Sequence, residues 1–157
     1  MRYISSFLSF FCVATLCTAA VADPLPKSAK PLSSSWIKKA YSGNSAVWEM
    51  SMVYFASDGT TTGVFGVPPK ATFTGKWVVK GNKICMTNIP TNIKTKKVDE
   101  RTYTDCWIYY ADGKTILTSY YNDFAEGKGP NDDYYDGELS NLKKGDKVSA
   151  KYAKLIK

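Results

Sequence analysis

Dipeptides typical of tight β-turns recur at short intervals in this sequence, and they restrict the folds that the chain can adopt. The dipeptides Asp58-Gly59, Gly81-Asn82 and Asp112-Gly113 each lie between two runs in which apolar and polar residues alternate. Dipeptides of this kind form the turns of β-hairpins, which join antiparallel strands. None of the connections leaves room for the helical crossover that a parallel pair of strands needs. We therefore expect an antiparallel sheet.

The hairpin about Gly81-Asn82 predicts its own register. Its two arms are residues 72–80 and 83–89, and both alternate between apolar and polar side chains. Pairing across the turn places four apolar side chains on one face, with Val79 opposite Ile84 and Trp77 opposite Met86.

The hairpin about Asp112-Gly113 pairs residues 102–111 with residues 114–121. Its apolar side chains fall on both faces: Trp107, Tyr109, Ile116 and Tyr120 on one, and Ile108, Tyr110 and Leu117 on the other. Either this hairpin is covered on both sides or its register differs from the one that the turn suggests.

Outside these hairpins the sequence predicts one helix and four more strands. The serines at 33–35 are natural N-caps for a short helix, which ends near Gly43 because glycine readily adopts a left-handed C-cap conformation. The strands are expected at 48–55, 60–66, 134–142 and 147–152, the last two joined at Gly145-Asp146. In the first strand, alternation directs one set of side chains to the core: Trp48, Met50, Met52 and Tyr54. Residues 90–100 read as a polar loop.

These elements predict an all-β fold class. About eight antiparallel strands and one short N-terminal helix suit an up-and-down barrel, lipocalin-like, or a sandwich. Residues 33–157 are expected to form a single β domain without an internal linker.

The first 22 residues have the pattern of a secretory signal peptide. Arg2 gives a positive start, an apolar stretch follows, and Ala20-Val21-Ala22 offers the small residues that signal peptidase reads. An uncleaved anchor is the alternative. Residues 23–32, rich in proline and lysine, read as a leader rather than a packed element. We expect a periplasmic or secreted protein that keeps no transmembrane anchor after cleavage.

Only two cysteines lie outside that segment. Cys85 and Cys106 are expected to form a disulfide, because two cysteines in an exported chain most often pair. A redox pair is the alternative, but the chain contains no Cys-x-x-Cys motif.

Several of these features together resemble a known family. They are the Asp58-Gly59 turn, the run Phe73-Thr-Gly-Lys-Trp-Val-Val79, the run Gly81-Asn-Lys-Ile-Cys85, and Cys106 ahead of a further Asp-Gly turn. The chain resembles, over about residues 32–144, a family of small exported proteins from alpha-proteobacteria that is catalogued as a domain of unknown function. The resemblance implies a periplasmic or secreted Gram-negative protein with paired cysteines. It supplies no catalytic residues.

The composition argues against an enzyme. The chain has no histidine, which excludes Ser-His-Asp and Cys-His catalysis and histidine-ligated metals. Glu49 has no partner carboxylate for glycoside hydrolysis, and Ser35-x-x-Lys38 lacks the companion motifs of a serine–lysine enzyme. The acidic residues between Asp123 and Glu138 do not match a calcium loop, because Tyr134 stands where an oxygen ligand is needed. We expect no catalytic residues, no metal and no cofactor.

The net charge of +7 predicts a basic surface, but it does not predict a nucleic-acid site. The 21 lysines and arginines are spread along the chain, and an exported protein rarely meets nucleic acid. A basic surface that faces anionic envelope polymers or lipid headgroups fits the expected compartment better.

Two regions are candidate binding sites. Trp48 and Trp107 would line a barrel mouth that takes a sugar or a small apolar ligand, unless they simply fill the interior. The turn-rich segment 121–135 would instead present Tyr121, Asp123, Tyr134 and Tyr135 to a protein or glycan partner. The first reading predicts an exported, non-enzymatic β-barrel binding protein of the bacterial envelope. The second predicts a secreted inhibitor or host-facing interaction protein that acts through its loops.

Overall fold

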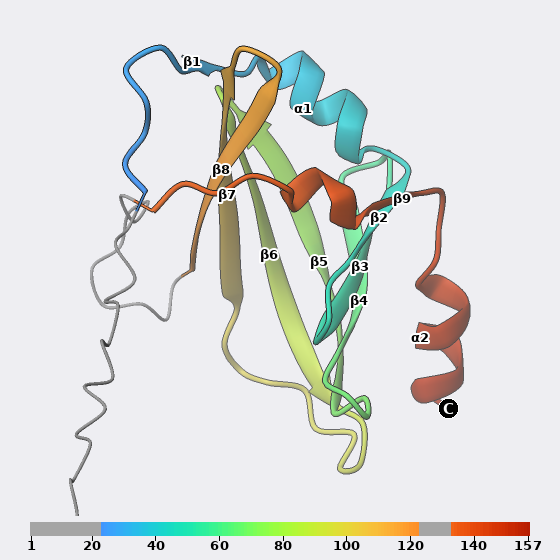
Figure 1. Cartoon of the computed structure of the whole chain (residues 1–157). Helices are drawn as coiled ribbons and strands as arrows, with labels where there is room; N and C mark the ends of the chain where they lie inside the picture. Colours follow the sequence, from blue (N-terminus) through green and yellow to red (C-terminus); the bar gives the residue numbers. More distant parts are fainter. Residues whose placement is uncertain (1–22, 123–132) are drawn as a thin grey trace, which may run out of the picture.

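The computed structural model describes residues 23–122 and 133–157. Within them, nine strands form one antiparallel sheet in the order β1-β7-β6-β5-β4-β3-β2-β9, with β8 paired to β7. The strands are β1 (Lys30–Pro31), β2 (Asn44–Val47), β3 (Ser51–Phe55), β4 (Thr60–Phe65), β5 (Ala71–Lys80), β6 (Lys83–Asn92), β7 (Tyr103–Asp112), β8 (Thr115–Asn122) and β9 (Leu142–Lys144). The helices are α1 (Ser34–Tyr41), the short 3₁₀ helix η1 (Glu138–Asn141) and α2 (Ser149–Leu155) (Figure 1).

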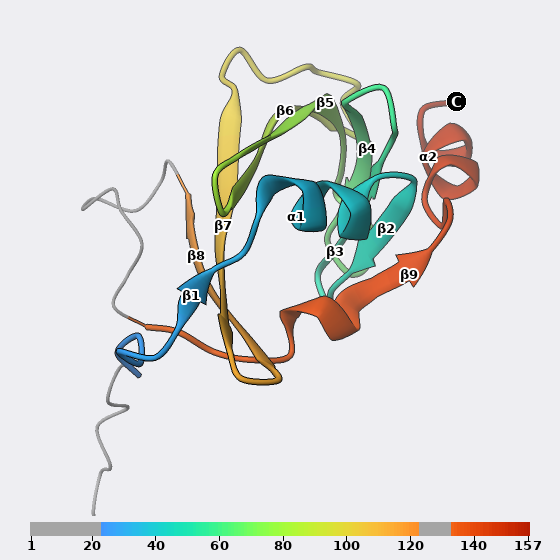
Figure 2. The ribbon, with the colours of Figure 1, turned by 90° about the horizontal axis from the view of Figure 1, so that it is seen from above.

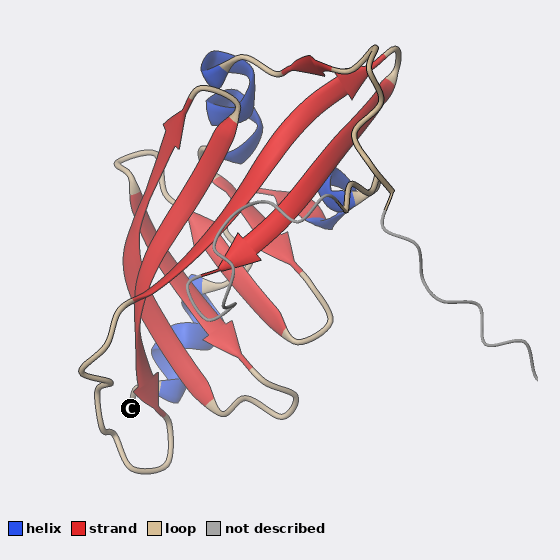
Figure 3. Ribbon diagram, turned by 90° about the vertical axis from the view of Figure 1, so that its left-hand side faces the viewer, coloured by secondary structure: helices blue, strands red, loops and turns tan. Residues whose placement is uncertain are grey.

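The sheet curls into a half-barrel, which confirms the all-β, barrel-like prediction. Seen from above, the strands follow a curve around α1, and the chain leading through η1 to β9 runs along the remaining side (Figure 2). The long strands run from one end of the molecule to the other (Figure 3). A sandwich would need two sheets, whereas the described strands belong to one.

The register of the β5–β6 hairpin is the predicted one. Val79 pairs with Ile84 and Trp77 with Met86. Gly81 has a φ of +60°, the left-handed conformation that such a turn requires. Of the four side chains, Trp77, Ile84 and Met86 are buried on the inner face.

The β7–β8 hairpin has the register that its turn suggests and is covered on both sides, which is one of the two alternatives that its sequence pattern left open. Trp107 and Tyr109 are buried on the inner face. On the outer face, the ring of Tyr110 meets that of Tyr134 edge-on, with centroids 5.7 Å apart. The backbone at Tyr135 pairs with Thr118 of β8, which holds this covering segment in place.

Helix α1 closes one end of the half-barrel. Ser33 is its N-cap, as predicted: the Ser33 side chain accepts a hydrogen bond from the Trp36 amide. Ile37 and Tyr41 are fully buried beneath the helix. The hydroxyl of Tyr41 is hydrogen-bonded to that of Tyr109, so this end of the interior is filled.

The predicted strand 48–55 is wrong at its start and in its core face. Strands β2 and β3 form a hairpin, and residues 48–50 lie in its turn. Val53 and Phe55 are the fully buried members of β3, whereas Met52 and Tyr54 are only half-buried. Both faces of this segment carry apolar residues, so pairing with the neighbouring strands decides which face points inward.

The predicted final hairpin, 134–142 with 147–152, is also wrong. The chain instead forms η1, the short strand β9 and helix α2. The Asp146 side chain accepts hydrogen bonds from the amides of Val148 and Ser149, which satisfies donors at the start of α2. The helix packs outside β4, where Val64 and Val148 are buried.

Two boundaries also differ from the prediction. The expected leader, residues 23–32, contains β1, which pairs with β7, and the Asp23 carbonyl accepts a hydrogen bond from the Tyr134 amide. Strand β6 continues to Asn92, into the expected polar loop. The predicted signal peptide, residues 1–22, lies outside the described residues.

Candidate functional site

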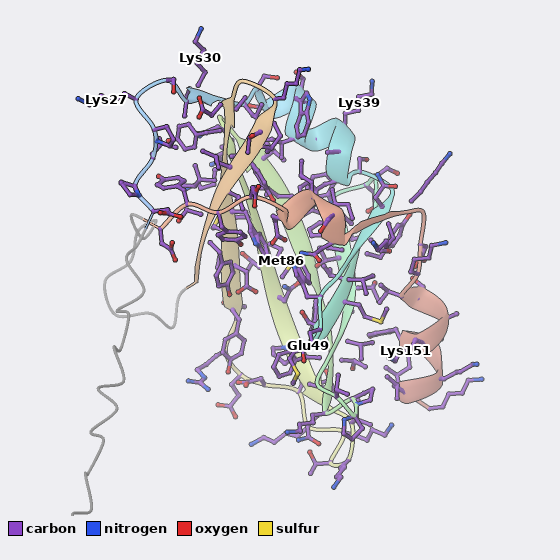
Figure 4. The ribbon with its side chains drawn as sticks, viewed as in Figure 1. Lys27, Lys30, Lys39, Glu49, Met86 and Lys151 are labelled. Carbon is purple, nitrogen blue, oxygen red and sulfur yellow. A yellow bond between two sulfur atoms is a disulfide. The ribbon has the colours of Figure 1, made fainter. Side chains whose placement is uncertain are left out.

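A cavity of about 590 Å³ occupies the half of the interior that lies away from α1. Six of its lining residues are aromatic: Trp48, Phe65, Phe73, Tyr103, Trp107 and Tyr120. Met86, Ala71 and Pro90 add apolar surface, and Ser51, Asn88 and Asp105 add polar atoms. Figure 4 shows Met86 inside the curl of the sheet. Small-molecule sites in proteins have this size and this mainly apolar lining.

The alternation of the long strands builds this lining. Phe73 on β5, Met86 on β6, Trp107 on β7 and Tyr120 on β8 all point inward. Trp107 pairs directly with Tyr120 across β7 and β8, so their rings meet on the inner face. Gly63 on β4 leaves space for the ring of Phe73, since a Cβ atom at this position would collide with it.

Three rings in contact form one side of the cavity, which we call the aromatic wall: Trp48, Trp107 and Tyr120. The indoles of Trp48 and Trp107 lie parallel, with centroids 5.5 Å apart and 5° between their planes. The Tyr120 ring lies 5.2 Å from Trp107 on a tilt of 43°. Offset aromatic pairs add about 0.5–1.5 kcal/mol beyond the area they bury, so this wall is pre-formed.

A buried carboxylate holds the outermost ring of the wall. The indole Nε1 of Trp48 donates a hydrogen bond of 2.7 Å to Oε1 of Glu138, while the Tyr135 hydroxyl and the Asn141 amide reach Oε2 at 3.3 and 3.4 Å. Glu138 is only 6% exposed. Burial raises the pKa of its carboxyl above the ordinary value, although the three hydrogen bonds lower it.

Two of the polar side chains that line the cavity, Asn88 and Asp105, accept hydrogen bonds from neighbouring side chains. Asn88 Oδ1 accepts a hydrogen bond of 2.7 Å from Thr61, and Asp105 Oδ1 accepts one of 2.6 Å from the Tyr120 hydroxyl. These bonds fix the side chains before any ligand arrives. The arrangement therefore suits a ligand that is mainly apolar and meets a few fixed polar atoms.

The structure separates the residues that the sequence singled out. Trp48 and Trp107, from positions far apart in the chain, meet in the aromatic wall. Tyr134 is buried against Tyr110, whereas Tyr135 is 39% exposed. The Tyr121 backbone lies in β8, but its side chain and the whole of Asp123 lie outside the described residues.

Sequence reasoning missed Glu138, which positions Trp48, as well as lining residues such as Phe65, Phe73 and Tyr103. In the sequence Glu138 is one acidic residue among several, and nothing nearby sets it apart. Its main partner, Trp48, lies 90 positions away, so no local pattern carries the information.

The predicted disulfide is present. Cys85 and Cys106 are bonded, and they face each other directly in the register of β6 and β7. Their Cα atoms are 4.2 Å apart, which is slightly shorter than the usual separation across a disulfide. In the described part of the chain, no helix is both long and apolar enough to cross a membrane.

The remaining expectations concern metals and catalysis. Among residues 23–122 and 133–157, no three His, Cys, Asp or Glu side chains are grouped as metal ligands would be. Glu49 lies in the β2–β3 turn, where its side chain is exposed.

Comparison with known proteins gives one match. The model of a family described as "Protein of unknown function (DUF995)" matches residues 9–134, which is most of the chain. No curated protein and no solved structure matches.

Proposed function

The chain belongs to the DUF995 family, and we propose that this member is an exported, non-enzymatic binding protein whose cavity holds a small, mainly apolar ligand. The observation that carries the proposal is the cavity of about 590 Å³ with its aromatic wall. A filled core would have favoured binding through the loops. The burial of Tyr134 also removes one of the four side chains proposed for a loop site.

Export is supported by two independent features. The Cys85–Cys106 disulfide is of the kind that persists in oxidising compartments. The first 22 residues have the charge and apolar pattern of a signal peptide. Cleavage after Ala22 would make Asp23 the first residue, and N-terminal sequencing of protein recovered from the periplasm or the medium tests this.

The non-enzymatic part of the proposal rests on the chemistry of the lining. The chain has no histidine, and Asp105 is the one acidic residue among those that line the cavity. A lone carboxylate hydrogen-bonded to a tyrosine suits ligand orientation better than acid–base chemistry, which in hydrolases uses paired groups.

A fluorescence titration with N-phenyl-1-naphthylamine, a neutral apolar dye that brightens on leaving water, tests the cavity. The wild-type chain is expected to bind the dye saturably. Ala71→Phe places a ring in the cavity and should weaken binding about tenfold or more. Val78→Phe lies on the same strand but on the outer face, so binding should be unchanged. Equal binding by all three proteins, or none by the wild type, would exclude a ligand site in the cavity.

A further inference from the structure

Three connections meet at one end of the molecule, in or beside which the cavity residues Trp48, Phe65, Ala71 and Tyr103 lie. We call this the mouth end and define it as residues 48–50, 66–70 and 93–102. The Gly66 amide donates a hydrogen bond of 2.7 Å to the Met50 carbonyl, and the Ile93 amide donates one of 3.1 Å to the Lys70 carbonyl. The three connections are therefore one continuous surface, opposite α1 (Figures 1 and 3).

Large apolar side chains project from this surface. Met50 is 45% exposed, Val67 66% and Val98 54%, one from each connection. Phe65, at the end of β4, is 50% exposed at the edge of the cavity. The end near α1 exposes only Trp36 and Val78 among the large apolar side chains of the described residues. Apolar side chains gathered on one surface usually mark an interaction site.

Basic side chains surround these apolar groups. Lys70, Lys94, Lys96, Lys97 and Arg101 are exposed at the mouth end. Its acidic residues are Glu49, Asp99 and Glu100, and Asp99 is paired with Arg101 at 3.7 Å. The Lys96 ammonium also donates a hydrogen bond to the Leu155 carbonyl, so the lysine-bearing helix α2 lies next to the mouth end. The mouth end is thus both apolar and positively charged.

We propose that the mouth end docks on an anionic phospholipid surface. Lysines near such a surface gain electrostatic attraction, while apolar side chains enter the boundary between headgroups and acyl chains. The excess of positive charge around the apolar groups is complementary to an anionic bilayer. Docking in this way brings the cavity residues Phe65 and Tyr103, which adjoin the mouth end, close to the membrane. The inference rests on the mouth end alone and does not require the cavity to hold a ligand.

Co-sedimentation of the full chain with vesicles tests the proposal. The chain should sediment with vesicles that contain phosphatidylglycerol and stay in solution with pure phosphatidylcholine vesicles. Lys94→Gln together with Lys97→Gln should weaken binding on the order of tenfold. Lys30→Gln together with Lys39→Gln removes the same charge at the far end (Figure 4) and should change binding by less than about twofold.

A second pair of variants tests the apolar contribution. Val98 and Val78 are both 54% exposed, but only Val98 lies at the mouth end. Val98→Ser should weaken vesicle binding severalfold, and Val78→Ser should leave it unchanged. Equal losses in the matched variants would show attraction without a defined surface and overturn the proposal. Failure to bind anionic vesicles, with self-association of the chain in sedimentation velocity runs, would assign the mouth end to a second copy instead.

Discussion

The Trp48 indole is held on two sides by different forces. Its ring face stacks on Trp107, and its Nε1 donates to Glu138. Stacking alone would leave the ring free to slide, and a hydrogen bond alone would leave it free to tilt. Together they set the position of the outermost ring of the aromatic wall, so Glu138 is a positioning residue for the cavity.

Stability should depend on pH through Glu138. Its pKa is raised in the folded state by burial, so between the unfolded and folded pKa values the folded chain binds more protons. The free energy of unfolding contributed by Glu138 is then greatest below the unfolded pKa and declines as pH rises through the folded one. Glu138→Gln removes this decline and keeps an acceptor for Trp48. In urea unfolding of both proteins across roughly pH 4 to 7, the free energy of unfolding of the variant should rise relative to that of the wild type as the pH rises.

The exposed residue Glu100 supplies the control for that experiment. Glu100→Gln also removes one negative charge, but from a side chain at the surface. A stability difference between Glu138→Gln and wild type that stays constant with pH would show that the Glu138 carboxyl is solvated as an ordinary one.

Gly63 should control the shape of the cavity through Phe73. A methyl group at this position collides with the Phe73 ring, so Gly63→Ala forces that ring into the cavity that it borders. We expect dye affinity to fall severalfold and the free energy of unfolding to fall by about 1–3 kcal/mol. Thr62→Ala, on the other face of β4, is the control. Unchanged dye affinity in Gly63→Ala would mean that the ring moves outward instead.

At the scale of elements, the disulfide joins two strands that are already neighbours. Cys85 and Cys106 are partners in the β6–β7 register, and the bond closes a loop between positions 21 apart in sequence. Its main effect is therefore on the unfolded chain, whose freedom it restricts.

Cys85→Ser with Cys106→Ser should lower the free energy of unfolding by about 3 kcal/mol. Guanidinium unfolding of the variant measures this loss, and the wild type with a reducing agent should match the variant. Mass spectrometry of an unreduced digest should recover the peptide that links the two cysteines. Recovery of both as free thiols would contradict the bridge.

Helix α2 is favoured by hydrogen bonds with the segment that precedes it and by its packing against β4. Partial burial raises the pKa of the Asp146 carboxyl, but hydrogen bonds from the Ser149 side chain and from the Ser149 and Val148 amides outweigh it and lower that pKa. The helix then covers the outer face of β4, where Val64 would otherwise meet water. A strand in the same place would leave that face uncovered.

At the scale of the whole molecule, the cavity and the mouth end lie on the same axis as α1. The helix fills one end of the half-barrel, and the other end carries Met50, Phe65, Val67 and Val98, most of the large apolar side chains exposed at the two ends. The two ends therefore have different roles: one supplies the core, and the other supplies the surfaces proposed for ligand and membrane.

Replacing residues 122–133 with a Gly-Ser linker distinguishes the two classes of function. If the cavity is the binding site, the circular dichroism spectrum and the dye affinity should remain within about twofold of wild type, since the lining residues lie outside this segment. Loss of a captured protein or glycan partner from envelope extracts, with dye binding intact, would support a loop site around the remaining candidates Tyr121, Asp123 and Tyr135.

The sequence by itself determined the hairpins about Asp58-Gly59, Gly81-Asn82 and Asp112-Gly113, but not the one expected about Gly145-Asp146. Gly81-Asn82 with its flanking alternation was sufficient for the correct register of β5 and β6, and Ser33 was sufficient for the start of α1. These features depend on neighbours in the chain: turn conformation, side-chain alternation and capping all act within a few residues. The antiparallel sheet follows from them, because short turns admit no other pairing.

Only the tertiary structure decided which side chains of β3 face inward, which secondary structure the C-terminal segment forms, and where the cavity lies. Val53 and Phe55 face inward because β2 and β4 set the register, and Trp48 meets Trp107 and Glu138 only once the sheet has curled. The energies of such contacts come from burial and from hydrogen bonds between distant residues, which leave no periodic trace in the sequence. The cavity is the clearest case, since it is a space bounded by residues from seven different parts of the fold rather than a property of any one of them.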